Sequence, residues 1–503
     1  MSKINKVKYT REALLGLIGG TALLISGCTG SEDTLSSSTT YKSASAASLA
    51  TTSASDYNDN ENGLITGTTL TSWIDDWATN KPAAISGELI ILQVSDGALT
   101  DTVDASCVDE NTDGTGVCKY FKPADGVRSY SLPSSTWVET RDNGVTETVS
   151  VVLSGEKMDA LLAAYDIDPT SDMIVFAMAQ GGGFQNMLMG RARYLFHYWG
   201  AESAHLAMLN GGATHASVIP AGDRGTYLGE SNSGPAPTGG TVSVKDLYVD
   251  NTVLQATLGE MMAVARGEVA DTFVWDARSP GEWGGDINST GATNSTCVDV
   301  DDIDNDTDTA ETVGCKTAMN GTVKGAKNLN YISLLVTDDA TEDLNNADGV
   351  TAADASYRYL DKATLATMVS DLGYTAGKTV YTYCRTTYRA MITGTTSGVI
   401  LGYPTRYYDG AMIEWLQMAS YANHEGGLNL PVTSPWQTAA LTDNLTYNSS
   451  AYVDVPIITD AYATSTDKVV EADRAYKAGS TSTSSPAAGS TGGVSIPANP
   501  CGG

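Results

Sequence analysis

The hydrophobic pattern of the chain alternates between short apolar runs and longer amphipathic stretches. Four apolar runs have the length of strands: GELIILQVSDG at 87–97, SDMIVFAMAQGGG at 171–183, ADTFVWDARSP at 270–280 and GKTVYTYCRTTYR at 377–389. Turn-forming residues bound each run, and helical stretches lie between them. Apolar strands that alternate with helices predict parallel sheets with helices on their faces.

The same succession of elements occurs twice along the chain. A strand precedes a pair of cysteines in SCVDENTDGTGVC (106–118) and again in TCVDVDDIDNDTDTAETVGC (296–315). After each pair come another apolar strand, a loop, a helical stretch that ends at glycine, and a short strand before Asn-Gly or Asp-Gly. We therefore predict an α/β fold made of two tandem domains, each a parallel sheet flanked by helices.

The start of the chain has the pattern of an export signal. A basic leader precedes the apolar run ALLGLIGGTALLI (13–25), which ISGC (25–28) follows. This segment resembles the bacterial lipobox, and the resemblance implies a lipid-modified Cys28. Thr29 after it favours the outer membrane, so we expect a cell-envelope protein that is anchored to the lipid bilayer. The alternative is an ordinary secretory signal with a chance cysteine.

Composition completes the predicted division of the chain. Two segments rich in Ser, Thr and Ala have too little bulky apolar surface to fold, one after Cys28 and one from about residue 478. The predicted parts are a lipoprotein signal peptide with its lipobox (1–28), a Ser/Thr-rich tether (29–60), an N-terminal domain (61–215), a linker (216–244), a C-terminal domain (245–440), and a C-terminal extension with a disordered tail (441–503).

Charge narrows the possible partners. The 503 residues include 59 acidic and 29 basic side chains, which gives a formal net charge of -30. Nucleic acid is excluded as a partner, because no basic stripe survives such an excess of carboxylates. No segment after the leader is long and apolar enough to span a bilayer.

Four of the seven cysteines bracket short polar loops. In an oxidising compartment we expect disulfides Cys107–Cys118 and Cys297–Cys315. The alternative, unpaired or metal-bound thiols, lacks Cys-x-x-Cys or histidine spacing, and no metal site is predicted from it. The aspartates of loop 299–311 suggest Ca²⁺, but the spacing of an EF-hand is absent, and a solvated acidic loop is favoured. Cys501 is left as an accident, an intermolecular bridge or a resolving thiol.

Cys384 has no such partner in the sequence. It follows the strand pattern KTVYTY (378–383) and precedes a stretch that reads as a helix ending at Gly402. Ligands bind at this end of a parallel strand, and a helix N-terminus favours negative charge. Arg385 and Arg389 add positive charge. We therefore expect an accessible, ionised thiol that attacks an anionic sulfur compound.

Three segments resemble the rhodanese sulfurtransferases. YCRTTYRA (383–390) resembles the active-site loop of that family, FVWDARSPGEW (273–283) its first strand, and LGYPTRYYDGAMIEW (401–415) the region after the loop. The resemblance implies a tandem rhodanese that takes sulfur from thiosulfate, holds it as a persulfide on Cys384 without another cofactor, and passes it to a thiol or similar thiophilic acceptor. The segment 179–187 has no cysteine, so the N-terminal domain is expected to be inactive.

The resemblance also implies roles for other residues. The residues that would bind substrate follow the nucleophile directly: Arg385, Thr386, Thr387, Tyr388 and Arg389. The residues that would support the loop from behind are Asp276, Arg278, Asp409, Glu414 and Trp415. Arg191 and Arg193 either line the cleft or are structural, and a structural role is favoured.

The sequence departs from the family at four positions. Thr387 stands where relatives often have glycine, Thr322 and Lys324 replace the usual His and Pro, and Glu282 adds no positive charge.

Two other functions fit the same residues. One is thiol-dependent handling of selenite or tellurite, and the other is a surface binding module without catalysis.

Overall fold

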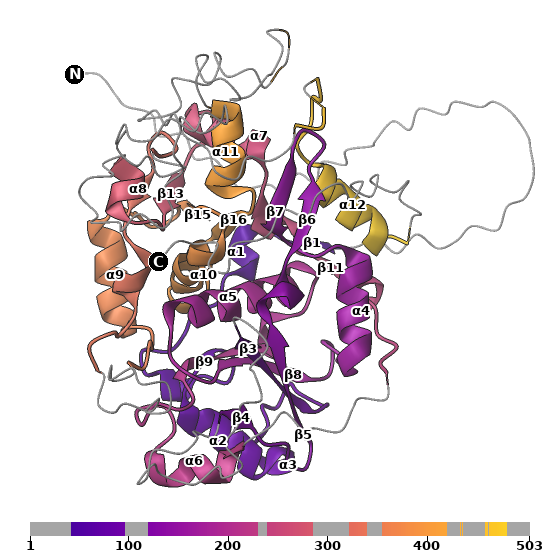
Figure 1. The fold of residues 1–503 in the computed structure, drawn as a ribbon, viewed down its shortest axis with the longest axis vertical. Helices are drawn as coiled ribbons and strands as arrows, with labels where there is room; N and C mark the ends of the chain where they lie inside the picture. The colour runs from indigo at the N-terminus through magenta and orange to yellow at the C-terminus, as the bar shows by residue number, and fades with distance from the viewer. Residues whose placement is uncertain are drawn as a thin grey trace, which may run out of the picture. The chain divides into compact units, whose positions relative to one another are not determined.

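The structure is a computed structural model of the whole chain, drawn in Figure 1. It describes residues 42–95, 119–229, 239–284, 321–339, 355–419, 433, 435, 458–460 and 462–479. All of them belong to the unit Thr40–Gly503. Within these residues, no helix has both the length and the apolar character needed to cross a bilayer.

Strands and helices alternate along most of the described chain. The strands are β1 Lys42–Ser43, β2 Gly63–Ile65, β3 Leu89–Ser95, β4 Tyr120–Phe121, β5 Val127–Pro133, β6 Glu139–Asp142, β7 Glu147–Val151, β8 Met173–Met178, β9 Leu206–Gly212, β10 Leu228–Gly229, β11 Val249–Asp250, β12 Gln255–Ala256, β13 Thr272–Asp276, β14 Lys327–Asn328, β15 Thr379–Tyr383 and β16 Thr405–Tyr408. The α-helices are α1 Ala46–Leu49, α2 Gly67–Asp75, α3 Trp77–Asn80, α4 Gly155–Tyr165, α5 Gly183–Tyr198, α6 Ala221–Tyr227, α7 Leu258–Ala265, α8 Pro280–Gly284, α9 Lys362–Asp371, α10 Tyr388–Thr395, α11 Ala411–Ala419 and α12 Lys468–Lys477.

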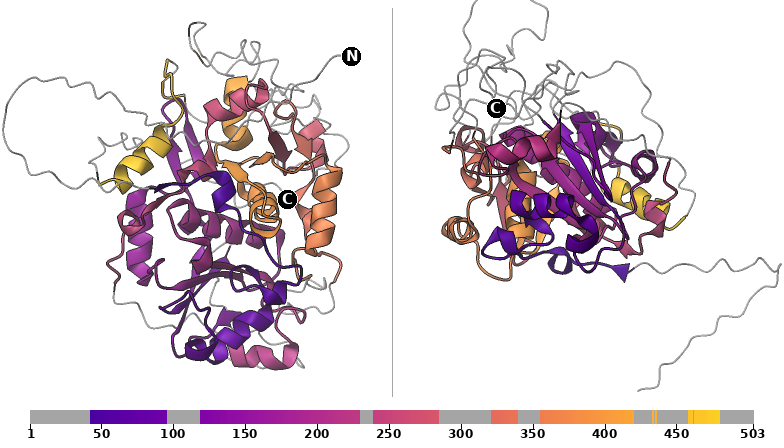
Figure 2. Two further views of the ribbon diagram at one scale, coloured as in Figure 1. Left: turned by 180° about the vertical axis from the view of Figure 1, so that it is seen from behind. Right: turned by 90° about the horizontal axis from the view of Figure 1, so that it is seen from below.

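Two parallel sheets with helices packed against them form the framework of the fold, which Figure 2 shows from two further sides. Each sheet has five strands, in the orders β2-β9-β8-β3-β5 and β12-β16-β15-β13-β14. When the strands of each sheet are numbered along the chain, both orders read 1-5-4-2-3. The prediction of an α/β fold with two parallel sheets and flanking helices is confirmed.

Both faces of each sheet are buried, which explains why the strands read as nearly continuous apolar runs. In β3, Ile90, Leu92 and Val94 face one core cluster, whereas Leu89 and Ile91 face another. Helices α2 and α3 cover the outer face of the first sheet, and α7 and α11 cover that of the second. The inner faces of the two sheets share a single cluster.

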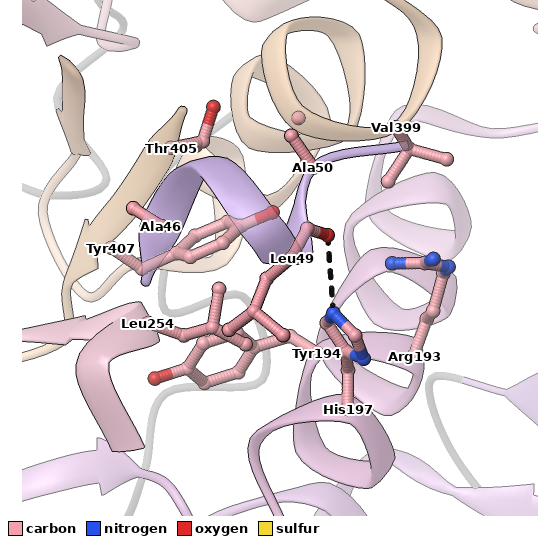
Figure 3. A pocket seen from close by; sticks show the side chains of 11 residues that line it. Ala46, Leu49, Ala50, Arg193, Tyr194, His197, Leu254, Val399, Thr405 and Tyr407 are labelled. Carbon is pink, nitrogen blue, oxygen red and sulfur yellow. Dashed lines mark hydrogen bonds between the residues drawn. The ribbon is translucent and has the colours of Figure 1, made fainter. Parts of the chain in front are cut away.

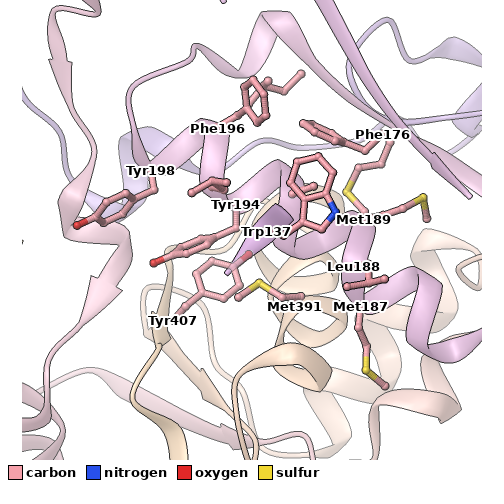
Figure 4. Packing of buried hydrophobic residues seen from close by; sticks show 14 of the residues in the cluster. Trp137, Phe176, Met187, Leu188, Met189, Tyr194, Phe196, Tyr198, Met391 and Tyr407 are labelled. Atoms are coloured by element: carbon pink, nitrogen blue, oxygen red, sulfur yellow. The ribbon is translucent and has the colours of Figure 1, made fainter. Parts of the chain in front are cut away.

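Helices α5 and α10 contribute many of the side chains of this shared core (Figure 4). Each follows the equivalent strand of its own sheet, β8 or β15, and aromatic and methionine side chains fill the space around them. Gly190 of α5 lies against Met391 of α10, where a Cβ on Gly190 would be 2.7 Å from the Cβ of Met391. The absence of a side chain at Gly190 therefore lets the two helices cross at close range.

Residues 42–60 are ordered against the fold, although their composition predicted part of a tether. β1 pairs with β11, and the backbone of Thr51 donates to Gly398 O at 2.8 Å. Ser53 is buried and donates through its backbone to Ile400 O at 3.2 Å. Backbone hydrogen bonds hold this segment. Because such bonds do not depend on the side chains, the amino-acid composition did not predict them.

Several predictions lie outside the described residues. These are the lipid-modified Cys28, the disulfides of Cys107 with Cys118 and Cys297 with Cys315, the acidic loop 299–311, and Cys501. The cell-envelope location and the predicted boundaries of the domains stay predictions.

Candidate functional site

Cys384 lies where β15 ends and α10 begins. The strand covers Thr379–Tyr383, and the helix starts at Tyr388. The backbone of the loop is fixed from behind, because Met412 N donates to Cys384 O at 3.0 Å and Ile413 N donates to Arg385 O at 3.2 Å. The thiol therefore sits at the carboxyl end of a central parallel strand, as the sequence predicted.

The thiol itself is fully buried, with an exposed fraction of 0%. It packs with Ala277 and Ala390, and the partly exposed Tyr331 covers this small cluster. The prediction of an accessible thiol was wrong, because the segment containing Tyr331 folds back over the end of the sheet, where Tyr331 N donates to Ala277 O at 3.2 Å. Cys384 is the one cysteine in the described part of the chain, and it is a thiol rather than a disulfide.

Thr387 precedes α10 in the left-handed backbone region, with φ at +67°. A β-branched residue rarely adopts this conformation, which costs on the order of 1–2 kcal/mol. The Oγ1 atom lies 3.0 Å from both Tyr408 O and Asp409 O, which fixes the side chain to the next strand. The resemblance led us to expect glycine at this position. This chain has Thr387 there instead, and the two contacts hold its side chain in place.

Arg389 is paired with Glu282. Its two terminal nitrogens donate to the carboxylate at 2.6 and 2.8 Å, and both side chains are largely buried. Burial alone raises the pKa of Glu282, but Arg389 outweighs it and lowers this pKa to about 2. The carboxylate thus neutralises a guanidinium that was expected to hold substrate oxygens.

Glu282 was therefore missed as a partner in the sequence, although a signal for its position exists. Ser279 and Glu282 form the Ser-x-x-Glu pattern of a capping box. The backbone N of Ser279 donates to Glu282 at 3.1 Å, and Glu282 N donates to Ser279 Oγ at 3.3 Å. This box at the start of α8 aims the carboxylate at Arg389.

The other predicted binding residues follow the thiol around the loop. Thr386 and Tyr388 are buried, and Arg385 is half-buried. The ring of Tyr388 lies 5.8 Å from that of Phe184, at the start of α5 in the first half of the chain. A Cβ on the neighbouring Gly183 would lie 3.4 Å from the ring of Tyr331. Three aromatic side chains, Phe184, Tyr331 and Tyr388, therefore gather beside the thiol loop.

Asp276 and Arg278 form a fully buried ion pair at the end of β13. The guanidinium donates to both carboxylate oxygens, with Nη2 to Oδ2 at 2.6 Å and Nε to Oδ1 at 2.9 Å. Thr322 Oγ1 lies 3.1 Å from Asp276 Oδ2 and 2.7 Å from the hydroxyl of Tyr383. Thr322 thus joins the ion pair to Tyr383, the last residue of β15 and the neighbour of Cys384.

Asp409 and Glu414 lie behind the loop, and both contact the first half of the chain. Asp409 accepts from Val152 N at 2.8 Å and pairs with the buried Arg191, whose Nη2 is 3.2 Å from Oδ2. Glu414 accepts from Asn143 Nδ2 at 2.5 Å. Trp415 is fully buried beside them. Asp409 and Glu414 therefore link the loop to the β6–β7 hairpin and to α5, and Glu414 also lines a small cavity with Asn143.

We predict that Glu414 makes the stability of the protein depend on pH. Burial, with a smaller contribution from Asp409, raises the pKa of Glu414 to about 7. The folded state therefore holds a proton that the unfolded state releases at its ordinary pKa of about 4.5. The stabilisation is complete below about pH 4.5 and disappears as the pH rises through 7, a loss on the order of 2–3 kcal/mol.

Urea unfolding at about pH 5 and about pH 8.5 checks this expectation. Glu414→Gln keeps the shape and an oxygen acceptor for Asn143 but cannot ionise, so its free energy of unfolding should change less between the two pH values. An equal change in the wild-type protein and the variant would show that another group is responsible.

Metal ligands are not clustered in the described part of the chain, where no group of three or more His, Cys, Asp or Glu side chains is arranged to hold an ion. The chemical groups described at the site are its thiol, its guanidinium–carboxylate pairs and its aromatic rings.

Comparisons with known proteins give similarity to solved structures. No protein-family model matches the chain, and no curated protein matches it. An anaerobic ergothioneine biosynthesis enzyme from Chlorobium limicola, in complex with trimethyl histidine, matches with a TM-score of 0.43 and 13% identity over 72% of this chain and 69% of that one. A persulfide form of EanB with ergothioneine gives 0.43 and 13% over 70% and 68%. Wild-type EanB gives 0.42 and 12% over 70% and 67%.

These matches correct the interpretation drawn from the resembling segments. The solved structures belong to an ergothioneine biosynthesis enzyme that binds trimethyl histidine, and not to a tandem rhodanese lipoprotein. The predictions of a thiosulfate sulfurtransferase, of thiosulfate and a thiol acceptor as partners, and of the selenite, tellurite and binding-module alternatives are withdrawn with it. The lipid anchor has no support in these matches.

The geometry of the loop gives a physical reason for this correction. Thiosulfate would need paired positive charge next to the thiol, but Arg389 is already neutralised by Glu282. The thiol is also buried among alanine methyl groups and an aromatic ring. One of the similar solved structures, that of EanB with ergothioneine, has a persulfide on a cysteine of its own.

Proposed function

We propose that Cys384 carries a sulfur atom as a cysteine persulfide and passes it to a small acceptor that binds beside the thiol loop. The observation that carries this proposal is the backbone of the loop. It runs from the end of a central parallel strand directly into a helix, and Thr387 is held there in a strained conformation. Strain of this kind is concentrated at functional sites, and backbone N–H groups at a helix start stabilise a thiolate.

The acceptor class follows from the aromatic side chains at the loop. Phe184, Tyr331 and Tyr388 present rings next to Cys384, and aromatic faces attract cations and stack on planar groups. At the loop's edge the charges of Arg389 and Glu282 compensate each other, and the positive charge of Arg385 is half-buried. A net charge of -30 favours the approach of cations over anions. The acceptor is therefore a small cationic molecule with an aromatic ring.

The sulfur is loaded and delivered in two displacement steps. The thiolate of Cys384 attacks the outer sulfur of a low-molecular-weight persulfide, R–S–SH. The S–S bond of the donor breaks, R–S⁻ leaves, and Cys384 becomes a persulfide. A carbon of the acceptor that has lost its proton to water then attacks the outer sulfur, a C–S bond forms, and the Cys384 thiolate leaves. Because the thiol is buried, both partners reach it when Tyr331 moves aside.

The loading step predicts a mass change on one residue. The full chain is incubated with glutathione persulfide, alkylated, digested and examined by mass spectrometry. The peptide that contains Cys384 should gain one sulfur atom, and Cys384→Ser should abolish the gain completely. Cys501→Ser is the matched control and should load like the wild-type protein. If the wild-type Cys384 peptide gains no sulfur, the proposed function is wrong.

The delivery step is tested separately on the loaded protein. Trimethyl histidine, which one of the similar solved structures binds, serves as the probe acceptor. The sulfur should leave Cys384 and appear on the probe. Tyr331→Ala should load sulfur at least as fast as the wild-type protein, because the thiol is uncovered, but should transfer it more slowly. If sulfur loads onto Cys384 but is not transferred to the probe, the proposed acceptor class is wrong, whereas the proposed persulfide is supported.

A further inference from the structure

The buried side chain of Arg193 lies outside the thiol site. Arg193, on α5, has an exposed fraction of 5%. Its Nε and Nη2 atoms are buried and have no hydrogen-bond partner among the described residues. Other buried arginines differ in this respect, because Arg191, Arg278 and Arg389 each have a carboxylate within 2.8 Å. Among the described side chains, no carboxylate forms an ion pair with Arg193.

Arg193 lines a cavity of about 20 Å³. The cavity lies between α5, the segment that contains α1, and the end of α10's helical extension at Val399 (Figure 3). In Figure 3 the guanidinium points from α5 toward Leu49 and Ala50. A cavity of this size holds one or two atoms as large as a water molecule, and it is too small for sulfate or phosphate.

The surroundings of Arg193 leave its charge uncompensated. The neighbouring His197 contacts backbone carbonyls, with Nδ1 at 2.9 Å from Ala201 O and Nε2 at 3.3 Å from Leu49 O, and a neutral imidazole donates to one of the two. Burial and the charge of Arg193 lower the pKa of His197 to about 4, so the imidazole is neutral near pH 7. Burial also lowers the pKa of Arg193 to about 10, which still leaves the guanidinium protonated. An unpaired buried charge is costly, and a water molecule supplies no opposite charge.

We propose that this cavity binds a small monovalent anion, of which chloride is the simplest, against the guanidinium of Arg193. The anion satisfies the two buried N–H groups and neutralises the charge in one step. Because α1 and the residues after it form one wall, the bound anion also fastens the N-terminal segment to α5. The site is separate from Cys384, which does not line this cavity.

Thermal unfolding of the full chain tests the site. At equal ionic strength, sodium chloride should raise Tm relative to sodium gluconate, whose anion is too large, by about 2 °C at saturation. The excess of acidic residues disfavours loose binding of anions to the surface, so a saturable effect points to a defined site. Arg193→Met should remove the difference between the salts.

Arg266→Met is the matched control, because Arg266 is half-exposed and pairs with Glu268. It should keep the full chloride effect. If Arg193→Met does not fold, crystals of the wild-type protein grown with sodium bromide provide a second test, because bromide has an anomalous signal. A bromide peak next to Arg193 supports the proposal. Equal Tm values in both salts, a chloride effect that survives Arg193→Met, or no bromide peak at Arg193 would each overturn it.

Discussion

Arg191→Met should lower the free energy of unfolding by about 3–5 kcal/mol. The side chains of Arg191 and Asp409 have exposed fractions of 1% and 0%. Removal of the guanidinium leaves the Asp409 carboxylate buried with one remaining described donor, Val152 N, at 2.8 Å. The effect is large because a single charge is left without compensation, and because Arg191 and Asp409 come from different halves of the chain. Urea unfolding measures it.

Two further variants distinguish the loss of the buried Arg191–Asp409 pair from the effect of removing any arginine. Arg266→Met breaks an exposed pair with Glu268 and should cost at most about 1 kcal/mol. The double variant Arg191→Met with Asp409→Asn removes both charges and keeps an acceptor for Val152, so it should regain part of the loss. If Arg191→Met costs no more than Arg266→Met, the buried pair does not hold the halves together.

Gly190→Val should destabilise the protein by about 3 kcal/mol or more. A Cβ at this position lies 2.7 Å from the Cβ of Met391 and 3.1 Å from its carbonyl oxygen. Neither atom belongs to the flexible end of a side chain, so a change of rotamer cannot relieve the overlap. The helices α5 and α10 must move apart, which opens the shared core around Tyr194 and Tyr407.

Gly222→Ala should have the opposite effect and stabilise the protein. Gly222 lies in α6, and no atom lies within 4 Å of the Cβ that alanine would add. Alanine favours the helix over glycine, so this variant should gain about 0.5–1 kcal/mol. Thermal or urea unfolding of both variants checks whether Gly190→Val lowers the free energy of unfolding and Gly222→Ala raises it. A stable Gly190→Val protein would mean that the two helices do not cross where the structure has them.

The strands were predictable from the sequence because their residues are buried on both sides. KTVYTY and the other apolar runs became β15, β13, β8 and β3 within a few residues of the expected bounds. The stretch after Cys384 is helical as expected, although it runs through a π-helical turn at Thr396–Ile400 before Gly402 takes a positive φ. Residues 42–60 could not be predicted, because backbone hydrogen bonds to Gly398 and Ile400 hold them.

The position of the candidate thiol was predictable, but its surroundings were not. A cysteine between a strand and a helix fixes where the sulfur lies along the chain. Whether it is covered depends on Tyr331, more than fifty residues earlier, and whether Arg389 is available depends on Glu282, more than a hundred residues earlier. Contacts over such separations are set by the packing of the whole fold. The pattern of a strand, a cysteine and a helix therefore predicted where the thiol lies, whereas the resemblance to one family did not predict its surroundings or its substrate.

The helix α12 has a consequence for how the protein is made. Asp473 of this helix binds Arg141 of β6 through two hydrogen bonds, at 2.7 and 2.9 Å, and also accepts from the hydroxyl of Tyr198. Both partners belong to the first half of the described chain, whereas Asp473 follows Tyr198 by 275 residues and Arg141 by 332. On the ribosome, the guanidinium of Arg141 must therefore wait for its counter-charge until α12 has been synthesised.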